Sequence, residues 1–148
     1  MRSNYWKFGL VLSINAVVMF LITYVIIDGL QHFHANINRA YMAILMVSPM
    51  ALLMLWTMRS MYQDRKLNWI LAGIFVAIMI GVFMLIRTQT PVDDEQFLHS
   101  MIPHHSGAIL MCERSAITDQ EIRRLCETIV KTQKDEIAQM EAILTRLN

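Results

Sequence analysis

The sequence predicts an all-α membrane protein, in which three transmembrane helices precede a small extracytoplasmic helical hairpin. Of the 148 residues 55% are hydrophobic, and three long runs without charged residues each approach the ~20 residues that cross a bilayer. After the third run the composition becomes polar, and apolar residues recur at helical spacing. We therefore divide the chain into a transmembrane region, 1–90, and an outer helical domain, 91–148.

The three uncharged runs are the predicted transmembrane spans, and they cover residues 8–27, 40–58 and 67–86. The first run is longer than the apolar core of a signal peptide, and no small-x-small cleavage site follows it, so we expect it to be retained. Three spans place the two ends of the chain on opposite sides of the membrane. The lipid bilayer is therefore the first partner that the sequence predicts.

Basic residues in the short connections indicate the orientation of the spans. Most of them lie before the first span or between the second and third: Arg2, Lys7, Arg59, Arg65 and Lys66. This bias places the N-terminus in the cytoplasm and the outer domain on the other side. In a bacterium the protein would lie in the inner (cytoplasmic) membrane, with its C-terminal domain in the periplasm.

Helix-start signals and one proline define the expected hairpin of the outer domain. Acidic residues at 93–95 favour a helix N-terminus, and we expect that helix to run to about residue 114 and to bend near Pro103. Because proline has no N–H, the carbonyl of His99 loses its usual helical donor. A capping-box pattern, Thr118 to Glu121, opens the second helix.

One face of the first outer helix carries side chains that bind soft metal ions. With Met101 at the origin of a helical wheel of about 100° per residue, four potential ligands lie within roughly 80° of it: His104, His105, Met111 and Cys112. Imidazole and thioether groups suit copper better than calcium or magnesium, because soft donors match a soft ion. The alternative is an ordinary packed face, since methionine at helical spacing commonly fills a core.

The outer domain also carries a more specific pattern of residues. It consists of Phe97, the run Met101-Ile102-Pro103-His104-His105, Ala108-Ile109, Met111, Gln133, Ile137 and Met140. This pattern, over Val92–Asn148, resembles the family called domain of unknown function 305. The resemblance implies a ferritin-like helical domain, and in some members copper binding and tolerance in the bacterial periplasm. It also implies a metal-facing set: Met101, His104, His105, Met111 and Met140.

The expected function is therefore copper binding, with Cu(I) favoured, for sequestration, delivery or tolerance. A periplasmic protein that donates or accepts the metal would be its partner. The alternative is a non-catalytic, membrane-anchored oligomerisation or interaction module in which the same histidines and methionines are structural. We expect no enzyme, because di-iron bundles need Glu-x-x-His pairs that this sequence lacks. We also expect no nucleic-acid binding, because the outer domain has no basic patch.

Further histidines and methionines lie outside that set. His32 and His34 occupy the loop between the first two spans, on the periplasmic side. They either add ligands to the site or pass an ion toward it, or they are polar residues of the membrane interface. The last interpretation is the commoner one. In the second span methionine recurs every four residues from Met42 to Met58. Flexible thioethers that fill gaps between helices explain this stripe better than a copper conduit.

The second outer helix completes the expected arrangement. Gln133 and Glu136 interrupt its apolar face, and either hydrogen-bonds a ligand histidine or is a boundary position that faces water. Two helices alone bury little surface, so we expect a homo-oligomer, most simply a dimer that forms a four-helix bundle. In a hairpin centred near residues 116–117, Cys112 and Cys126 would be offset by about 7 Å, and we expect no disulfide between them.

Overall fold

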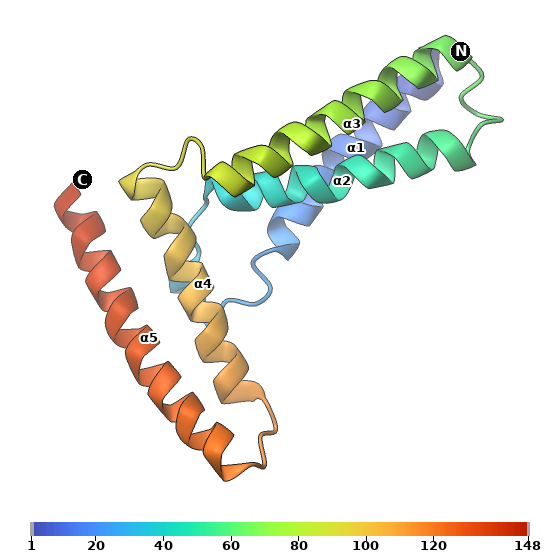
Figure 1. Cartoon of the computed structure of the whole chain (residues 1–148). Coiled ribbons are helices and arrows are strands. Elements are labelled where there is room, and N and C mark those ends of the chain that lie inside the picture. Colours follow the sequence, from blue (N-terminus) through green and yellow to red (C-terminus); the bar gives the residue numbers. More distant parts are fainter. Residues whose placement is uncertain (1, 148) are drawn as a thin grey trace. The chain divides into compact units, whose positions relative to one another are not determined.

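The computed structural model describes residues 2–147 and the side chains of residues 4–147. Within this range the chain is all-α, with five α-helices, one 3-10 turn and no strand. The helices are α1 (Arg2–Ile22), α2 (Ile37–Thr57), α3 (Arg65–Thr88), α4 (Asp94–Arg114) and α5 (Gln120–Leu147), with η1 (Leu30–His32) between α1 and α2 (Figure 1). They form two compact units: residues up to Thr23 with Asn38–Pro91, and Tyr24–Ile37 with the residues from Val92 onward.

The first unit contains three helices that are long and apolar enough to cross a membrane. They are Asn4–Ile22, Ile37–Thr57 and Arg65–Thr88, close to the three spans that the sequence predicts. One end of this unit is held by aromatic and polar contacts. The Phe8 ring lies 5.4 Å from that of Tyr62, and the Tyr5 hydroxyl donates to Asn68 Oδ1 at 2.8 Å. The regularly spaced methionines of α2 differ in their surroundings. Met54 packs against the buried core that includes Phe8 and Tyr62, whereas Met42 is exposed.

The first span ends earlier than the sequence predicts. Helix α1 ends at Ile22, and the apolar residues that follow, up to Ile27, belong to a loop of the second unit. Tyr24 is buried there, and its hydroxyl donates to the His34 carbonyl at 2.7 Å. Hydrophobicity does not distinguish apolar residues that face lipid from apolar residues that a loop packs against protein, which explains the five-residue difference.

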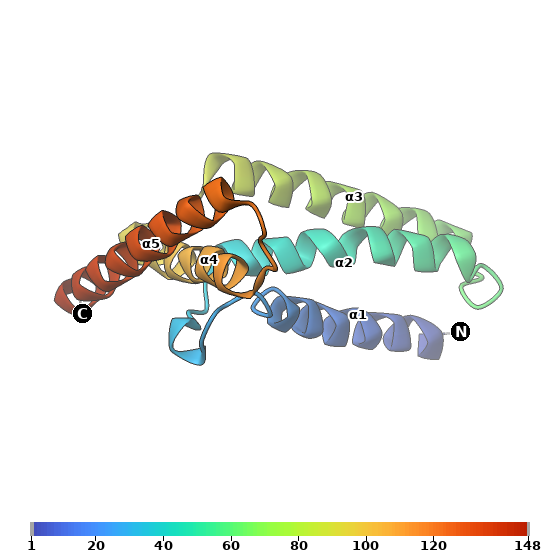
Figure 2. The same cartoon turned by 90° about the horizontal axis from the view of Figure 1, so that it is seen from below.

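The second unit is an antiparallel hairpin of α4 and α5, which lie side by side in both views (Figure 1, Figure 2). Its core is built from Leu98, Ile102 and Ile109 of α4 and from Ile137, Met140 and Leu144 of α5. Both N-termini are capped by aspartate. Asp93 accepts from the Gln96 N–H at 2.8 Å, and Asp119, not the predicted Thr118, accepts from Glu121 and Ile122 at 2.8 and 3.0 Å.

The loop 24–36 contacts α4 where Pro103 removes a helical hydrogen bond. The His99 carbonyl has no donor at position 103, and the side-chain amide of Asn36 donates to it instead, at 3.1 Å. The same amide donates to the His34 carbonyl at 3.0 Å. Asn36 is only 5% exposed, so this interaction is shielded from water. The proline thus leaves a carbonyl without a helical donor, and Asn36 of the loop supplies the donor.

A second contact lies one turn further along α4. Ser106 is fully buried, and its Oγ accepts from the Asp28 N–H at 2.8 Å and lies 2.9 Å from His32 Nδ1. The next residue is Gly107, where an added Cβ would lie 3.4 Å from both Ile26 Cδ1 and the Ile26 carbonyl oxygen. A small residue at this position therefore lets the loop approach the helix backbone.

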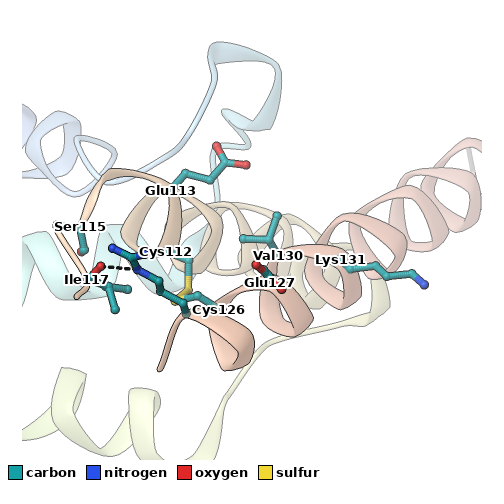
Figure 3. A pocket seen from close by; sticks show the side chains of 9 residues that line it. Cys112, Glu113, Ser115, Ile117, Cys126, Glu127, Val130 and Lys131 are labelled. Atoms are coloured by element: carbon teal, nitrogen blue, oxygen red, sulfur yellow. Dashed lines mark hydrogen bonds between the residues drawn. A yellow bond between two sulfur atoms is a disulfide. The ribbon is translucent and has the colours of Figure 1, made fainter. Parts of the chain in front are cut away.

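A disulfide joins Cys112 and Cys126, with Cα atoms 5.3 Å apart, so the prediction of unbonded cysteines was wrong (Figure 3). The prediction assumed a symmetrical bend. In the structure α4 ends at Arg114 and the loop Ser115–Asp119 continues past that end before α5 begins (Figure 1). The first turns of α5 then run back beside the loop, and Cys126 reaches the level of Cys112.

Candidate metal-binding site

His105 is held between the two helices of the hairpin. Its Nδ1 lies 2.8 Å from the Met101 carbonyl oxygen, and because a carbonyl only accepts, Nδ1 carries the proton of this hydrogen bond. Its Nε2 faces Oε2 of Glu136 on α5 at 2.9 Å. The amide of Gln133 donates to the same Glu136 oxygen at 3.2 Å. The backbone contact therefore fixes the ring, and Nε2 is the nitrogen presented to α5.

Two methionines lie one helical turn from this pair. Met101 precedes His105 by four residues on α4, and Met140 follows Glu136 by four on α5. Because the helices are antiparallel, both thioethers fall on the same side of the His105–Glu136 pair. Met140 is buried in the hairpin core, and Met101 is partly buried against that core. We call His105, Glu136, Met101 and Met140 the His105 cluster.

The remaining two predicted ligands lie apart from the His105 cluster. His104 is exposed, and its ring centroid is 6.0 Å from that of His105. Met111 is 67% exposed and lies seven residues beyond His104, a rise of about 10 Å along the helix. The structure thus groups Met101, His105 and Met140 and leaves His104 and Met111 outside. Glu136 contacts His105 Nε2 directly, in agreement with the expectation that it can hydrogen-bond a histidine of α4.

The contact between the two helices has the length of a charge-assisted hydrogen bond. His105 Nε2 and Glu136 Oε2 are 2.9 Å apart. Within residues 4–147, where side chains are described, no three side chains of His, Cys, Asp or Glu are grouped closely enough to hold a metal ion. Further ligands at this point would therefore be thioether sulfurs.

The other histidines form a second group. All five histidines of the chain lie in the second unit. The ring of His34 in the loop stacks on that of His99 in α4, with centroids 5.1 Å apart and planes inclined by 29°. Glu95 Oε1 lies 3.9 Å from His99 Nε2. The loop histidines therefore lie against α4, a placement that the sequence left open.

The surroundings of His34 favour its neutral form. Burial lowers the pKa of His34, and the positive charge of a protonated His99 or His32 lowers the pKa further. The Glu141 carboxylate acts in the opposite direction, though less strongly than burial. His34 therefore keeps an unprotonated ring nitrogen to a lower pH than a solvated histidine does.

A groove of about 530 Å³ lies over the disulfide (Figure 3). The guanidinium Nε of Arg123 donates to the Ile117 carbonyl at 2.8 Å beside it. The groove is lined by Cys112, Glu113, Ser115, Ile117, Arg123, Cys126, Glu127, Val130 and Lys131. It includes none of the five predicted ligands, so we do not assign the metal site to it.

Comparison with known proteins identifies a matching family and a viral relative. Residues 83–144 match the family model described as "Domain of unknown function (DUF305)", a stretch that includes the whole His105 cluster. The "Uncharacterized protein L153" of Acanthamoeba polyphaga mimivirus is 36% identical over 111 residues, which cover 74% of this chain and 71% of that protein. That similarity is longer than the family match and extends into the first 82 residues. No solved structure matches the chain. By the family match and this relative, the chain belongs to the DUF305 family.

Proposed function

We propose that this protein is a membrane-anchored copper-binding protein that holds Cu(I) at the His105 cluster, for sequestration or delivery and without catalysis. The observation that carries the proposal is the orientation of His105. Its Nδ1–H is committed to the Met101 carbonyl, and its Nε2 points to Glu136 across the hairpin. Metal-binding histidines commonly donate one ring N–H to a backbone carbonyl in this way, which fixes the other nitrogen for the ion.

The donor types favour copper over other ions. The cluster offers one imidazole, one carboxylate and two thioethers, and thioether sulfur is a soft donor that selects Cu(I). The Met101 and Met140 side chains are partly or wholly buried in the hairpin core. The Glu136 side chain is 45% exposed, so an ion bound there would be shielded on the side of the two sulfurs and accessible from the side of the carboxylate.

The disulfide supports the orientation that we propose for the outer domain. Structural disulfides persist in oxidising compartments, such as the bacterial periplasm, and are rare in the cytosol. The Cys112–Cys126 bond lies in the second unit. An outer domain in the periplasm, anchored in the inner membrane with a cytoplasmic N-terminus, fits both this bond and the basic residues that precede the first span.

One observation favours the alternative function, a non-catalytic interaction module. The short contact between His105 and Glu136 is a complete ion pair when the ring is protonated, and it joins α4 to α5 without a metal. In that case the cluster would stabilise the hairpin, and the module would act through its protein contacts. Copper affinity distinguishes the two functions.

The test is the Cu(I) affinity of the purified full-length protein in detergent, measured by competition with a chromophoric chelator. We expect tight binding that falls about a hundredfold in His105→Ala, equivalent to about 2.7 kcal/mol. Met101→Leu and Met140→Leu keep the volume of the core and should each weaken binding. The matched control is His104→Ala, which removes the neighbouring exposed imidazole and should leave the affinity unchanged. Weak binding that none of these changes alters would exclude the proposal and favour the interaction module.

A further inference from the structure

We propose that His34 and His99 form a second metal site, distinct from the His105 cluster, that takes a divalent ion of borderline softness such as Cu²⁺ or Zn²⁺. One imidazole comes from the loop between α1 and α2, and the other comes from α4. The site does not depend on the Cu(I) function, because the two sites share no residue.

Hydrogen bonds to the backbone carbonyls of His34 and His99 hold the two residues next to each other. The buried amide of Asn36 donates to the carbonyl of His34 at 3.0 Å and to that of His99 at 3.1 Å. The Tyr24 hydroxyl donates to the same His34 carbonyl at 2.7 Å. These contacts fix the two residues side by side whatever their side chains do. The 5.1 Å separation of the ring centroids follows from this arrangement.

The two rings differ from the other shielded histidines in what their nitrogens contact. His32 lies against the Ser106 hydroxyl, and His105 has a carbonyl and a carboxylate as partners. Within residues 4–147, the ring nitrogens of His34 and His99 make no hydrogen bond. Both rings are partly buried. Two adjacent, partly buried imidazoles with free nitrogens can bind a metal ion as neutral ligands.

Two neighbouring carboxylates can complete the coordination. The charge of Glu141 acts on His34, and Glu95 Oε1 is 3.9 Å from His99 Nε2. Both glutamates are exposed and have room to turn toward the rings. Since no third ligand is in place as the side chains lie, binding requires this rotation. Two imidazoles with carboxylate oxygen, and no sulfur, favour Cu²⁺ and Zn²⁺ over Cu(I).

The experiment is Cu²⁺ titration of the full-length protein without any affinity-tag histidines, followed by electron paramagnetic resonance. We expect one site whose spectrum shows hyperfine coupling to two nitrogens. His34→Gln and His99→Gln should each remove one nitrogen from the pattern and weaken binding at least about tenfold. Zn²⁺ should compete for the same site only in large excess, because nitrogen and oxygen ligands bind Cu²⁺ more tightly than Zn²⁺. The control, His104→Gln, should leave the spectrum and the affinity unchanged.

The side-chain changes leave the backbone carbonyls that Asn36 and Tyr24 contact, so the variants should keep the fold, which circular dichroism checks. Glu141→Gln tests the same site without altering either ring, and we expect several-fold weaker binding. A two-nitrogen spectrum that persists in the His34→Gln/His99→Gln double variant would overturn the proposal, as would a wild-type protein that binds no Cu²⁺. Loss of Cu(I) binding in His105→Ala with the Cu²⁺ spectrum intact would separate the two sites.

Discussion

Pro103 is the residue that explains most about the second unit. It has no N–H to donate to the His99 carbonyl, and a carbonyl that is buried without a donor costs about 1–3 kcal/mol. Asn36 removes that cost by donating to the carbonyl at 3.1 Å. The proline thus provides one of the contacts that place the α1–α2 loop on α4, together with those at Ser106 and Gly107, and His34 stacks on His99 beside it.

This account predicts an energetic coupling between Asn36 and Pro103. Asn36→Ala should lower the free energy of unfolding by about 1–3 kcal/mol, because the His99 carbonyl loses its donor. In a Pro103→Ala background the same change should cost less, because residue 103 then supplies the N–H itself. Thermal unfolding of the four proteins, followed by circular dichroism, measures the difference. Equal losses in both backgrounds would contradict the coupling.

At the scale of the elements, the sequence predicted those helix starts that the capping and first-turn residues determine. The start of α4 followed from its acidic first turn, and the position of the α5 start was wrong by only one residue, since Asp119 caps it and Thr118 does not. The end of α1 was missed, because the residues after Ile22 are as apolar as those before it.

Contacts that depend on how one element meets another could not be predicted. The disulfide depends on the path of the loop Ser115–Asp119, which carries no periodic pattern. The helical wheel correctly placed His105 near Met101 on one face of α4. It also placed His104 and Met111 there, because a wheel ignores the rise along the helix and the position of α5. To predict that Glu136 contacts His105, one would have needed to know the register of α5 against α4.

The disulfide should contribute measurably to the stability of the hairpin. It closes a loop with a sequence separation of 14 residues, and cross-linking a loop of this size removes unfolded-state entropy worth about 3 kcal/mol. The Cys112→Ser/Cys126→Ser variant should therefore melt at a lower temperature than the wild type. A reductant should lower the melting temperature of the wild type and leave that of the variant unchanged. A reductant without effect on the wild type would contradict the assignment.

At the scale of the whole molecule, the hairpin is small and leaves apolar side chains uncovered. Ile122 and Leu125 of α5 are 49% and 57% exposed. A domain of two helices buries little surface, and pairing with a second copy as a four-helix bundle would cover more of it. We therefore expect a dimer of the detergent-solubilised protein by light scattering. Leu125→Lys should shift it toward monomer, whereas Glu121→Lys, an exposed position near the start of the same helix, should not. A wild-type monomer would contradict this expectation.

The central claim is that copper binds at the His105 cluster through nitrogen and thioether sulfur. The most direct measurement is X-ray absorption at the copper edge of the Cu(I)-loaded full-length protein, beside the Met101→Leu/Met140→Leu double variant and a Met111→Leu control. The account predicts mixed nitrogen and sulfur scattering in the wild type and in Met111→Leu, with the sulfur contribution lost in the double variant. Copper bound without sulfur, or sulfur scattering that persists in the double variant, would contradict it.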